Sequence, residues 1–266
     1  MERLKREPIR TVVIGSGNVA SALAPALERA GAIAVEAVCS RNVAHAAELA
    51  SKLADALALD DLGAVPADAA LYLVSVSDDA IERVAAQLPH VQSAVCLHTS
   101  GGVDMTALSA VTPNYGVLYP LQTFSKGRAT EFAGIPVFVE GATEKALDMA
   151  RYLGNALNGD VRHADGNGRR SLHAAAVFAC NFTNHLYAIA ADILKREAGA
   201  DLSVLEPLLK ETLAKALRMP PADAQTGPAR RGDMKVMQGH VDLLQQHEAE
   251  LYKLLSDSIM QRYEQH

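Results

Sequence analysis

Short apolar runs alternate with helix-like stretches along residues 1–165. The run Ala70–Val76 is almost continuously apolar, which is typical of a strand in a sheet that is covered on both faces. Further strands are expected over residues 11–14, 34–39, 94–97, 116–118 and 136–139, with a short one at Val161. Strands that alternate with helices predict right-handed crossovers and a parallel, doubly wound sheet.

The stretches between these runs repeat their apolar residues with the period of an α-helix. From Asn18 onward, Val19, Leu23 and Leu27 follow one another at i, i+4 spacing. Further helices are expected over about 43–57, from Ser77 or Asp78 to near Pro89, and over about 144–157.

The pattern changes near Gly166–Gly168, after which few β-branched runs remain. An Ala-rich helix is expected over 171–198, and further helices over 202–217 and 236–263. The sequence therefore predicts an α/β protein with two domains. Residues 1–165 are expected to hold the sheet, and residues 166–266 to form an all-helical domain for substrate binding or dimerisation.

The turn after the first predicted strand reads Gly15-Ser16-Gly17-Asn18-Val19-Ala20. Gly15 permits a tight turn, Gly17 lets a pyrophosphate approach the backbone, and Ala20 allows close packing of helix and strand. The helix N-terminus adds free N–H groups and a partial positive charge. In this context the motif predicts a dinucleotide site in a Rossmann domain. A glycine-rich turn without a ligand is the alternative.

The second predicted strand ends in Ser40-Arg41-Asn42, where NAD-preferring sites usually carry an acid for the ribose 2′-hydroxyl. Arg41 suits bidentate binding of a 2′-phosphate, and Ser40 and Asn42 are able to donate hydrogen bonds. Glu36, the acid nearby, lies inside the strand and too early for the ribose. The cofactor predicted is NADP(H), with a solvated loop arginine as the alternative.

Polar residues also follow the next two strands, at the sheet edge where ligands bind in such folds. We expect Ser75, Ser77 and Ser100 to contact the cofactor, although Ser77 and Asp78 are better explained as helix caps. His98 is expected just past its strand in a glycine-rich loop. It is interpreted either as lining the ligand pocket or as bonding to the backbone.

Further candidates come from one more strand end and from the long helix. Tyr119 and Gln122 follow the strand over 116–118 and are substrate candidates. At 100° per residue, His173, Asn181 and Asn184 share an arc of about 80° on an otherwise apolar helix. Polar groups in such a surface need hydrogen-bond partners. We expect these side chains to face the cofactor cleft, or alternatively to contact a neighbouring helix or a partner subunit.

The segment Thr226–Asp233 combines a Gly-Pro turn with clustered charges before the last helix. A loop this polar is able to close over an anionic ligand, which makes Arg231 a substrate candidate.

Composition narrows the class of protein. The net charge of −6 offers no basic surface for nucleic acid or anionic membrane, and the apolar stretches are far shorter than a membrane span of about 20 residues. Residues 1–10 carry both charge signs and no apolar signal region. Cys39, Cys96 and Cys180 lie in apolar patterns without metal-site spacing, so we expect buried thiols and no metal. These features indicate a cytoplasmic protein that acts on a small molecule.

Together these segments resemble a family of bacterial Rossmann-like NADP oxidoreductases whose C-terminal half is known only as a domain of unknown function. They also look like distant relatives of pyrroline-5-carboxylate reductase and the 6-phosphogluconate dehydrogenase superfamily. The matching segments are Gly15–Ala20, Ser40–Arg41, His98–Gly101, Tyr119–Phe124, His173–Asn181, and Gly227–Asp233 with His240.

The resemblance implies an N-terminal NADP site, a helical C-terminal domain and a homodimer built through its helices. Many 6-phosphogluconate-type dehydrogenases carry a lysine about four residues before the helix asparagine. Val177 stands at that position here, and the nearest charged residues upstream are Arg169 and Arg170. Their proton relay therefore does not transfer directly to this chain.

Two functional hypotheses follow. The first is an NADP(H)-dependent oxidoreductase that moves a hydride to or from a C=O or C=N carbon of a small metabolite. His173 would supply the proton, because imidazole titrates near neutral pH, Asn181 would orient the substrate, and His98 would line the pocket. The second is a non-catalytic NADP(H)-binding sensor or scaffold, which the missing lysine keeps open.

Overall fold

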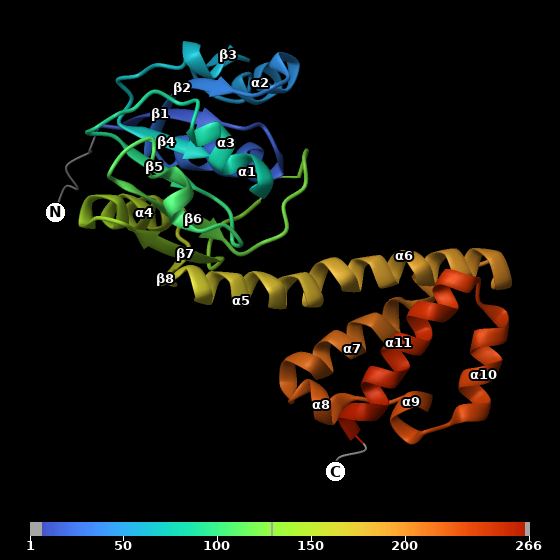
Figure 1. Cartoon of the computed structure of the whole chain (residues 1–266). Coiled ribbons are helices and arrows are strands. Elements are labelled where there is room, and N and C mark those ends of the chain that lie inside the picture. Colours follow the sequence, from blue (N-terminus) through green and yellow to red (C-terminus); the bar gives the residue numbers. More distant parts are fainter. Residues whose placement is uncertain (1–6, 129, 264–266) are drawn as a thin grey trace. The chain divides into compact units, whose positions relative to one another are not determined.

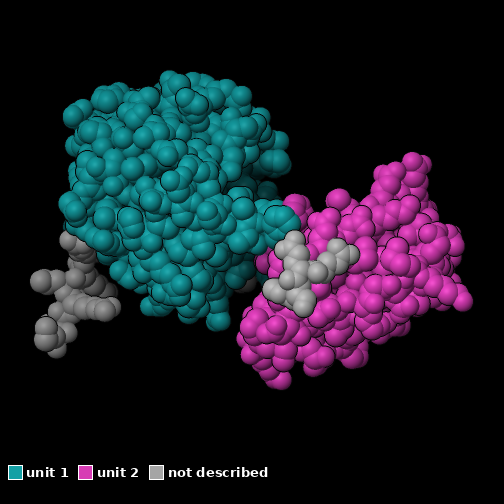
Figure 2. All heavy atoms as spheres, turned by 60° about the horizontal axis from the view of Figure 1, so that its bottom comes forward, with its two compact units in different colours: residues 1–178 teal, residues 179–266 magenta. Residues whose placement is uncertain are grey.

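The computed structural model describes residues 7–128 and 130–263. It divides into two compact units, residues 1–178 and 179–266 (Figure 2). The boundary between the units, at 178/179, falls inside a helical run that starts at Gly166. The sequence pattern predicted a domain boundary at 165/166, where this run begins. Within the described residues, no helix is both long enough and apolar enough to cross a bilayer.

Eight strands form one sheet in the first unit, in the order β3-β2-β1-β4-β5-β6-β7-β8 (Figure 1). The chain order reverses between β1 and β4, and ligands of doubly wound sheets bind at the carboxyl ends of the strands beside such a reversal. The predicted doubly wound α/β sheet is confirmed. The strands are β1 (Ile9–Ile14), β2 (Ile33–Cys39), β3 (Leu57–Leu59), β4 (Leu71–Val74), β5 (Val95–His98), β6 (Tyr115–Pro120), β7 (Pro136–Gly141) and β8 (Asp160–His163).

One pair of neighbouring strands departs from the predicted parallel arrangement. Strands β6 and β7 pair antiparallel, with Leu118 opposite Val139, and all other neighbours are parallel. A parallel return needs a crossover of a dozen or more residues, usually a helix. The described residues between β6 and β7 contain no helix, so the chain returns directly beside β6.

Both faces of the sheet are covered, as the apolar runs predict. Along β1, Val13 packs in one core with Leu23 of α1 (Asn18–Arg29). Its neighbour Val12 packs in the other core with Ile81 of α3 (Ile81–Ala85). Side chains in a strand point alternately to opposite faces, so each central strand contributes to both cores. Helices α2 (Val43–Ala50) and α4 (Glu144–Ala156) complete the first core.

The helix expected over about 43–57 is shorter than predicted. Helix α2 ends at Ala50, and Leu57–Leu59 forms the edge strand β3 against β2. A run of three residues carries too little periodicity to separate strand from helix, and pairing with β2 decides its conformation.

The helical run that joins the two units is not a uniform α-helix. It consists of α5 (Gly166–Ala176), a π-helical turn over Val177–Phe182, α6 (Thr183–Ile193) and a second π-helical turn over Leu194–Ala198. In Figure 1 it runs from yellow into orange.

The second unit is helical, as predicted, but its last helix is divided. After the helical run, the elements are η6 (Leu202–Leu205), α7 (Glu206–Arg218), α8 (Pro221–Ala224), α9 (Pro228–Arg231), α10 (Met234–Leu243) and α11 (Gln246–Tyr263). The predicted helix over 236–263 breaks because Glu248 accepts a hydrogen bond from the Gln245 backbone N–H and binds Arg196 through both carboxylate oxygens. That pairing starts a new helix instead of continuing α10.

Candidate functional site

The glycine-rich turn lies at the carboxyl end of β1, as predicted. Gly15 has a φ of 109°, and a Cβ there would stand 2.1 Å from the carbonyl oxygen of Ser75, so only glycine fits against the end of β4. Gly17 differs, because a Cβ on it would meet no atom within 4 Å. The first glycine is required by packing, and the second borders open space.

Helix α1 begins at this turn with an open N-terminus. Gly17 is its N-cap, no side chain caps the first N–H groups, and its first turn carries no acid. Free N–H groups beside open space fit the phosphates of a dinucleotide. Ser16 donates from Oγ to Ser40 Oγ at 2.9 Å and so joins the turn to the end of β2. Of the other motif residues, Asn18 is exposed, whereas Val19 and Ala20 pack toward the core.

The residues predicted to bind the 2′-phosphate follow β2. Arg41 is exposed and forms no ion pair with any described residue. Asn42 caps α2, since its Oδ1 accepts from the Ala44 backbone N–H at 2.9 Å, which leaves its amide NH₂ to donate. An unpaired guanidinium beside hydrogen-bond donors fits a phosphate group.

Two of the three predicted serines at the strand ends are used inside the fold. Ser75 is buried and accepts from Thr99 Oγ1 at 3.1 Å. Ser100 is buried as well, and its Oγ accepts from the backbone N–H groups of Gly102 and Val103. Ser77 is exposed and stands at the N-cap position of η2 (Asp78–Ala80) without a capping bond from its side chain.

The structure corrects the placement of His98. It is the last residue of β5 and fully buried, rather than a loop residue facing a pocket. Its Nδ1 accepts from the Ser100 backbone N–H at 3.2 Å, whereas its Nε2 is buried without a hydrogen-bond partner among the described residues. Burial lowers the pKa of His98 to about 4, and the Arg169 guanidinium adds to this effect. The neutral imidazole therefore has a structural role, because it accepts a hydrogen bond from the backbone of the loop that begins after β5.

Tyr119 and His173 come together, although they lie far apart in the sequence. The Tyr119 hydroxyl is 3.1 Å from His173 Nδ1, and the two rings meet edge to face. A Cβ on Gly101 would stand 2.5 Å from Tyr119 Cζ, so the loop packs directly on the phenol ring. Burial raises the pKa of the Tyr119 phenol, and the Asp78 carboxylate raises it further. The phenol therefore keeps its proton at neutral pH.

Gly102 marks where these groups converge. A Cβ on it would lie 3.1 Å from Asp78 Oδ2, 3.9 Å from His173 Cδ2 and 4.0 Å from Ser100 Oγ. Residues that follow β4 and β5 thus meet helix α5 around one partly exposed glycine. The sequence interpretation explained Asp78 mainly as a helix cap. Its position at the sheet edge was the available signal that it belongs to this group.

A buried arginine holds helix α5 against the sheet. Arg169 is fully buried, pairs with Glu140 of β7, and donates to the Val103 carbonyl at 2.9 Å. Its charge is therefore committed to the fold and is not available to a ligand. Because His173 lies four residues further along α5, this anchor also sets the position of the imidazole.

The remaining predicted residues have simpler surroundings. Gln122 is exposed and accepts from the Thr123 backbone N–H. Asn181 and Asn184 belong to the second unit and are exposed, as is Cys180, which corrects the expectation that all three thiols are buried. The 80° arc assumed a regular α-helix, but the π-helical turn over Val177–Phe182 changes the angular phase between His173 and the two asparagines.

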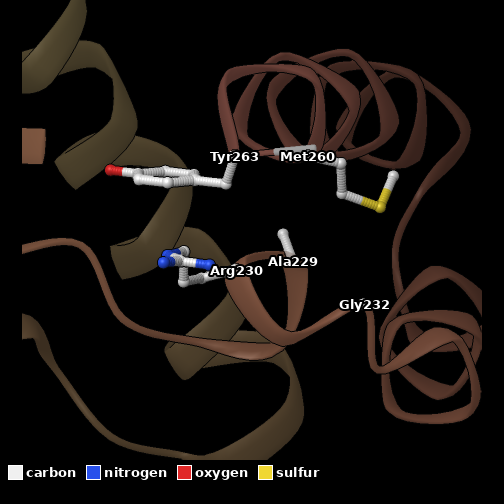
Figure 3. Close-up of a pocket in the computed structure, with 5 residues that line it drawn as sticks. All are labelled: Ala229, Arg230, Gly232, Met260 and Tyr263. Atoms are coloured by element: carbon white, nitrogen blue, oxygen red, sulfur yellow. The ribbon is translucent and has the colours of Figure 1, made fainter. Parts of the chain in front are cut away.

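The charged loop of the second unit folds into the short helix α9. Arg231 is exposed and lies 3.4 Å from Asp233. Its neighbour Arg230 stacks on the Tyr263 ring at 4.1 Å, and both line a pocket of about 100 Å³ with Ala229, Gly232 and Met260 (Figure 3). Further along, His240 Nδ1 lies 2.8 Å from the Tyr252 hydroxyl.

Comparison with known families gives two matches, and the second extends across the boundary between the two compact units. Residues 10–97 match the family described as NADP oxidoreductase coenzyme F420-dependent. Residues 135–259 match a domain of unknown function, DUF2520. No curated protein matches the sequence.

Solved structures extend the match over nearly the whole chain. A "putative NADP oxidoreductase" from Bacteroides fragilis is 39% identical, with 96% of this chain and 99% of that chain covered and a TM-score of 0.86. A protein from Thermotoga maritima is 20% identical over 96% and 98% of the two chains, with a TM-score of 0.66. An imine reductase from Myxococcus stipitatus, solved with NADP⁺, is 16% identical over 96% and 93%, with a TM-score of 0.61. The last two similarities show a shared fold alone.

Identity of 39% over nearly the full length of both chains establishes the family, and the two domain matches agree with it. The resemblance drawn from the sequence motifs and the NADP(H) cofactor expected from them are confirmed at this level. The chain belongs to the NADP oxidoreductase family in which a Rossmann coenzyme domain precedes a helical C-terminal domain of the DUF2520 type.

Proposed function

We propose that this protein is an NADP(H)-dependent reductase or dehydrogenase that transfers a hydride between the nicotinamide and a C=O or C=N carbon of a small metabolite. The observation that carries the proposal is the hydrogen-bonded pair of Tyr119 and His173 at the carboxyl edge of the sheet. Ligands of doubly wound sheets bind at this edge. A proton donor there stands where a substrate would meet the cofactor.

The cofactor site would consist of the α1 N-terminus and the end of β2. Backbone N–H groups from Gly17 onward would hold the pyrophosphate, since they are uncapped and face open space. Arg41, with Ser40 and the Asn42 amide, would bind the 2′-phosphate. When bound, NADPH supplies the hydride and becomes NADP⁺. The imine reductase from Myxococcus stipitatus, which shares the fold, was solved with the same cofactor.

The chain's own task is to deliver a proton to the oxygen or nitrogen of the substrate. A phenol hydroxyl both donates and accepts hydrogen bonds. Tyr119 would accept a hydrogen bond from His173 Nδ1–H, and this bond would persist after Nε2 has given its proton to the substrate, because the neutral imidazole keeps the Nδ1 proton. The pair would hold the His173 ring in place throughout this step, with Nε2 left for the substrate.

The decisive test is a titration of the pure protein with NADPH and NADH, followed by nicotinamide fluorescence, and then a screen of ketones and cyclic imines for NADPH consumption. Tight NADPH binding with turnover of one compound class is the expected result. Binding without turnover of any compound would favour the rival hypothesis of a sensor or scaffold, which Val177 in place of a lysine suggests. Absence of nucleotide binding would rule out both.

We also propose that the protein is a cytoplasmic homodimer built through its C-terminal helices. Among the described residues of the second unit only Ala229, Met237, Glu248 and Ser256 are buried, while large apolar side chains of α7 and α11 are open to solvent. The most exposed are Leu208 (62%), Leu213 (60%), Leu217 (78%) and Leu254 (68%). A helical unit with so small a core needs a partner to cover these faces. Light scattering of the full chain should give twice the mass of the monomer.

A further inference from the structure

The carboxylate of Asp78 is an unpaired negative charge beside the candidate proton donors. Asp78 is exposed, and its carboxylate takes part in no ion pair or hydrogen bond with a described residue. Its Oδ2 lies 3.1 Å from the point where a Cβ on Gly102 would stand, and the His173 ring borders the same point at 3.9 Å. A carboxylate and an imidazole thus border the same point beside Gly102.

The two arginines that precede His173 in helix α5 are committed elsewhere. Arg169 is buried against Glu140, and Arg170 donates to Asn167 within its own helix. The Asp78 charge nevertheless acts on the site, because it adds to the raised pKa of Tyr119 that burial mainly causes. A substrate carboxylate or phosphate would be repelled here, whereas a cation would find a carboxylate that forms no ion pair with a described residue.

We infer that Asp78 binds the positively charged nitrogen of the substrate, so that the substrate class is an iminium ion in the reducing direction and an amine in the oxidising direction. This inference rests on the proposed function and assigns the C=N alternative within it. Among the residues around Gly102, Asp78 then determines the specificity for a cationic substrate, whereas His173, oriented by Tyr119, donates the proton.

The chemistry balances with the groups at hand. His173 gives one proton to the nitrogen of a neutral imine, which forms the iminium cation next to the Asp78 carboxylate. The hydride from NADPH adds to the carbon, the C=N π electrons become the lone pair of the amine nitrogen, and NADP⁺ remains. A ketone would pass through an alkoxide instead, and the nearby carboxylate would disfavour that negative charge.

The test compares a cation and a neutral compound of the same size. The protein saturated with NADP⁺ is titrated with pyrrolidine, which is cationic at pH 7.5, and with cyclopentanol, and binding is followed by ligand-observed NMR. We expect pyrrolidine to bind at least tenfold more tightly, and Asp78→Asn to abolish that preference. Asp79→Asn removes a carboxylate charge one residue further along η2, and this control variant should keep the preference for pyrrolidine. If Asp78→Asn does not fold, Asp78→Ser replaces it.

The outcomes separate this inference from the proposed function. An NADPH titration of the same sample comes first, and its failure would remove the proposed function itself. If NADPH binds but wild-type protein holds both compounds equally, or holds neither, the assignment of a cationic substrate is wrong. Equal loss of preference in the Asp78 and Asp79 variants would likewise contradict a specific role for Asp78. In an activity assay, we expect the wild type to reduce 1-pyrroline in preference to cyclopentanone. Asp78→Asn should lose this preference.

Discussion

The hydroxyl of Tyr119, at the end of β6, lies 3.1 Å from Nδ1 of His173 in helix α5. Their ring centroids are 6.1 Å apart with an interplanar angle of 70°. A residue from the sheet and a residue from the helical run thus form one hydrogen-bonded pair. Each of the two residues can be replaced separately by mutation.

Replacing Tyr119 by Phe keeps the ring against Gly101 and removes only the hydroxyl. Because His173 then loses the group that orients it, we expect kcat for NADPH consumption to fall about tenfold or more, while the Kd for NADPH stays unchanged. Tyr115→Phe, at the opposite end of the same strand, is the matched control. An unchanged kcat in Tyr119→Phe would mean that the pair has no part in proton transfer.

Gly17→Ala distinguishes a phosphate site from an ordinary turn. A Cβ at Gly17 meets no protein atom within 4 Å, and the φ of −74° suits alanine, so thermal stability should remain that of the wild type. The methyl group would enter the space assigned to the pyrophosphate, and NADPH affinity should fall at least tenfold. Gly15→Ala should instead unfold the protein at lower temperature, because its Cβ meets the Ser75 carbonyl. Normal NADPH affinity in Gly17→Ala would argue against this site.

Arg41→Ala tests the choice between the two nicotinamide cofactors. Loss of charge-assisted hydrogen bonds to a 2′-phosphate costs about 1.5–3 kcal/mol, which corresponds to roughly a 10- to 150-fold weaker NADPH complex. NADH, which has no such phosphate, should bind as before. Arg29→Ala, at the far end of α1, controls for a general change of charge. A parallel loss for both nucleotides would assign Arg41 to something other than the 2′-phosphate.

The buried His98 makes stability depend on pH. Its pKa in the folded protein is about 4, and that of an unfolded histidine is about 6.5. Between these two pH values, His98 is protonated in the unfolded chain and neutral in the folded protein. The free energy of unfolding therefore decreases as the pH falls from 6.5 toward 4. The loss is on the order of 3 kcal/mol.

Urea unfolding of wild type and His98→Gln at pH 7 and pH 4.5 measures this dependence. The variant cannot take up the proton, so its free energy of unfolding should decline less over this interval, whatever its value at pH 7. Equal declines in the two proteins would show that other groups govern the acid sensitivity.

Local patterns in the sequence were sufficient for much of the fold. Near-continuous apolar runs and i, i+4 spacing predicted β1, β2, β4 and α1, because a sheet covered on both faces imposes these patterns on each segment separately. The turn Gly15–Ala20 combined strand, glycine and helix signals, and it lies where they place it. The change to helical pattern near Gly166 likewise agrees with the start of α5.

Pairing between distant segments decided the rest. The antiparallel β7, the edge strand β3 and the break at Gln245 each depend on a contact that no single segment contains: with β6, with β2, and with Arg196 through Glu248. The same holds for the candidate site. The types of Tyr119 and His173 were visible in the sequence, but their contact, the burial of His98 and the place of Asp78 beside Gly102 were not. Local periodicity reports which face of an element is apolar, whereas only packing of the elements determines which side chains meet.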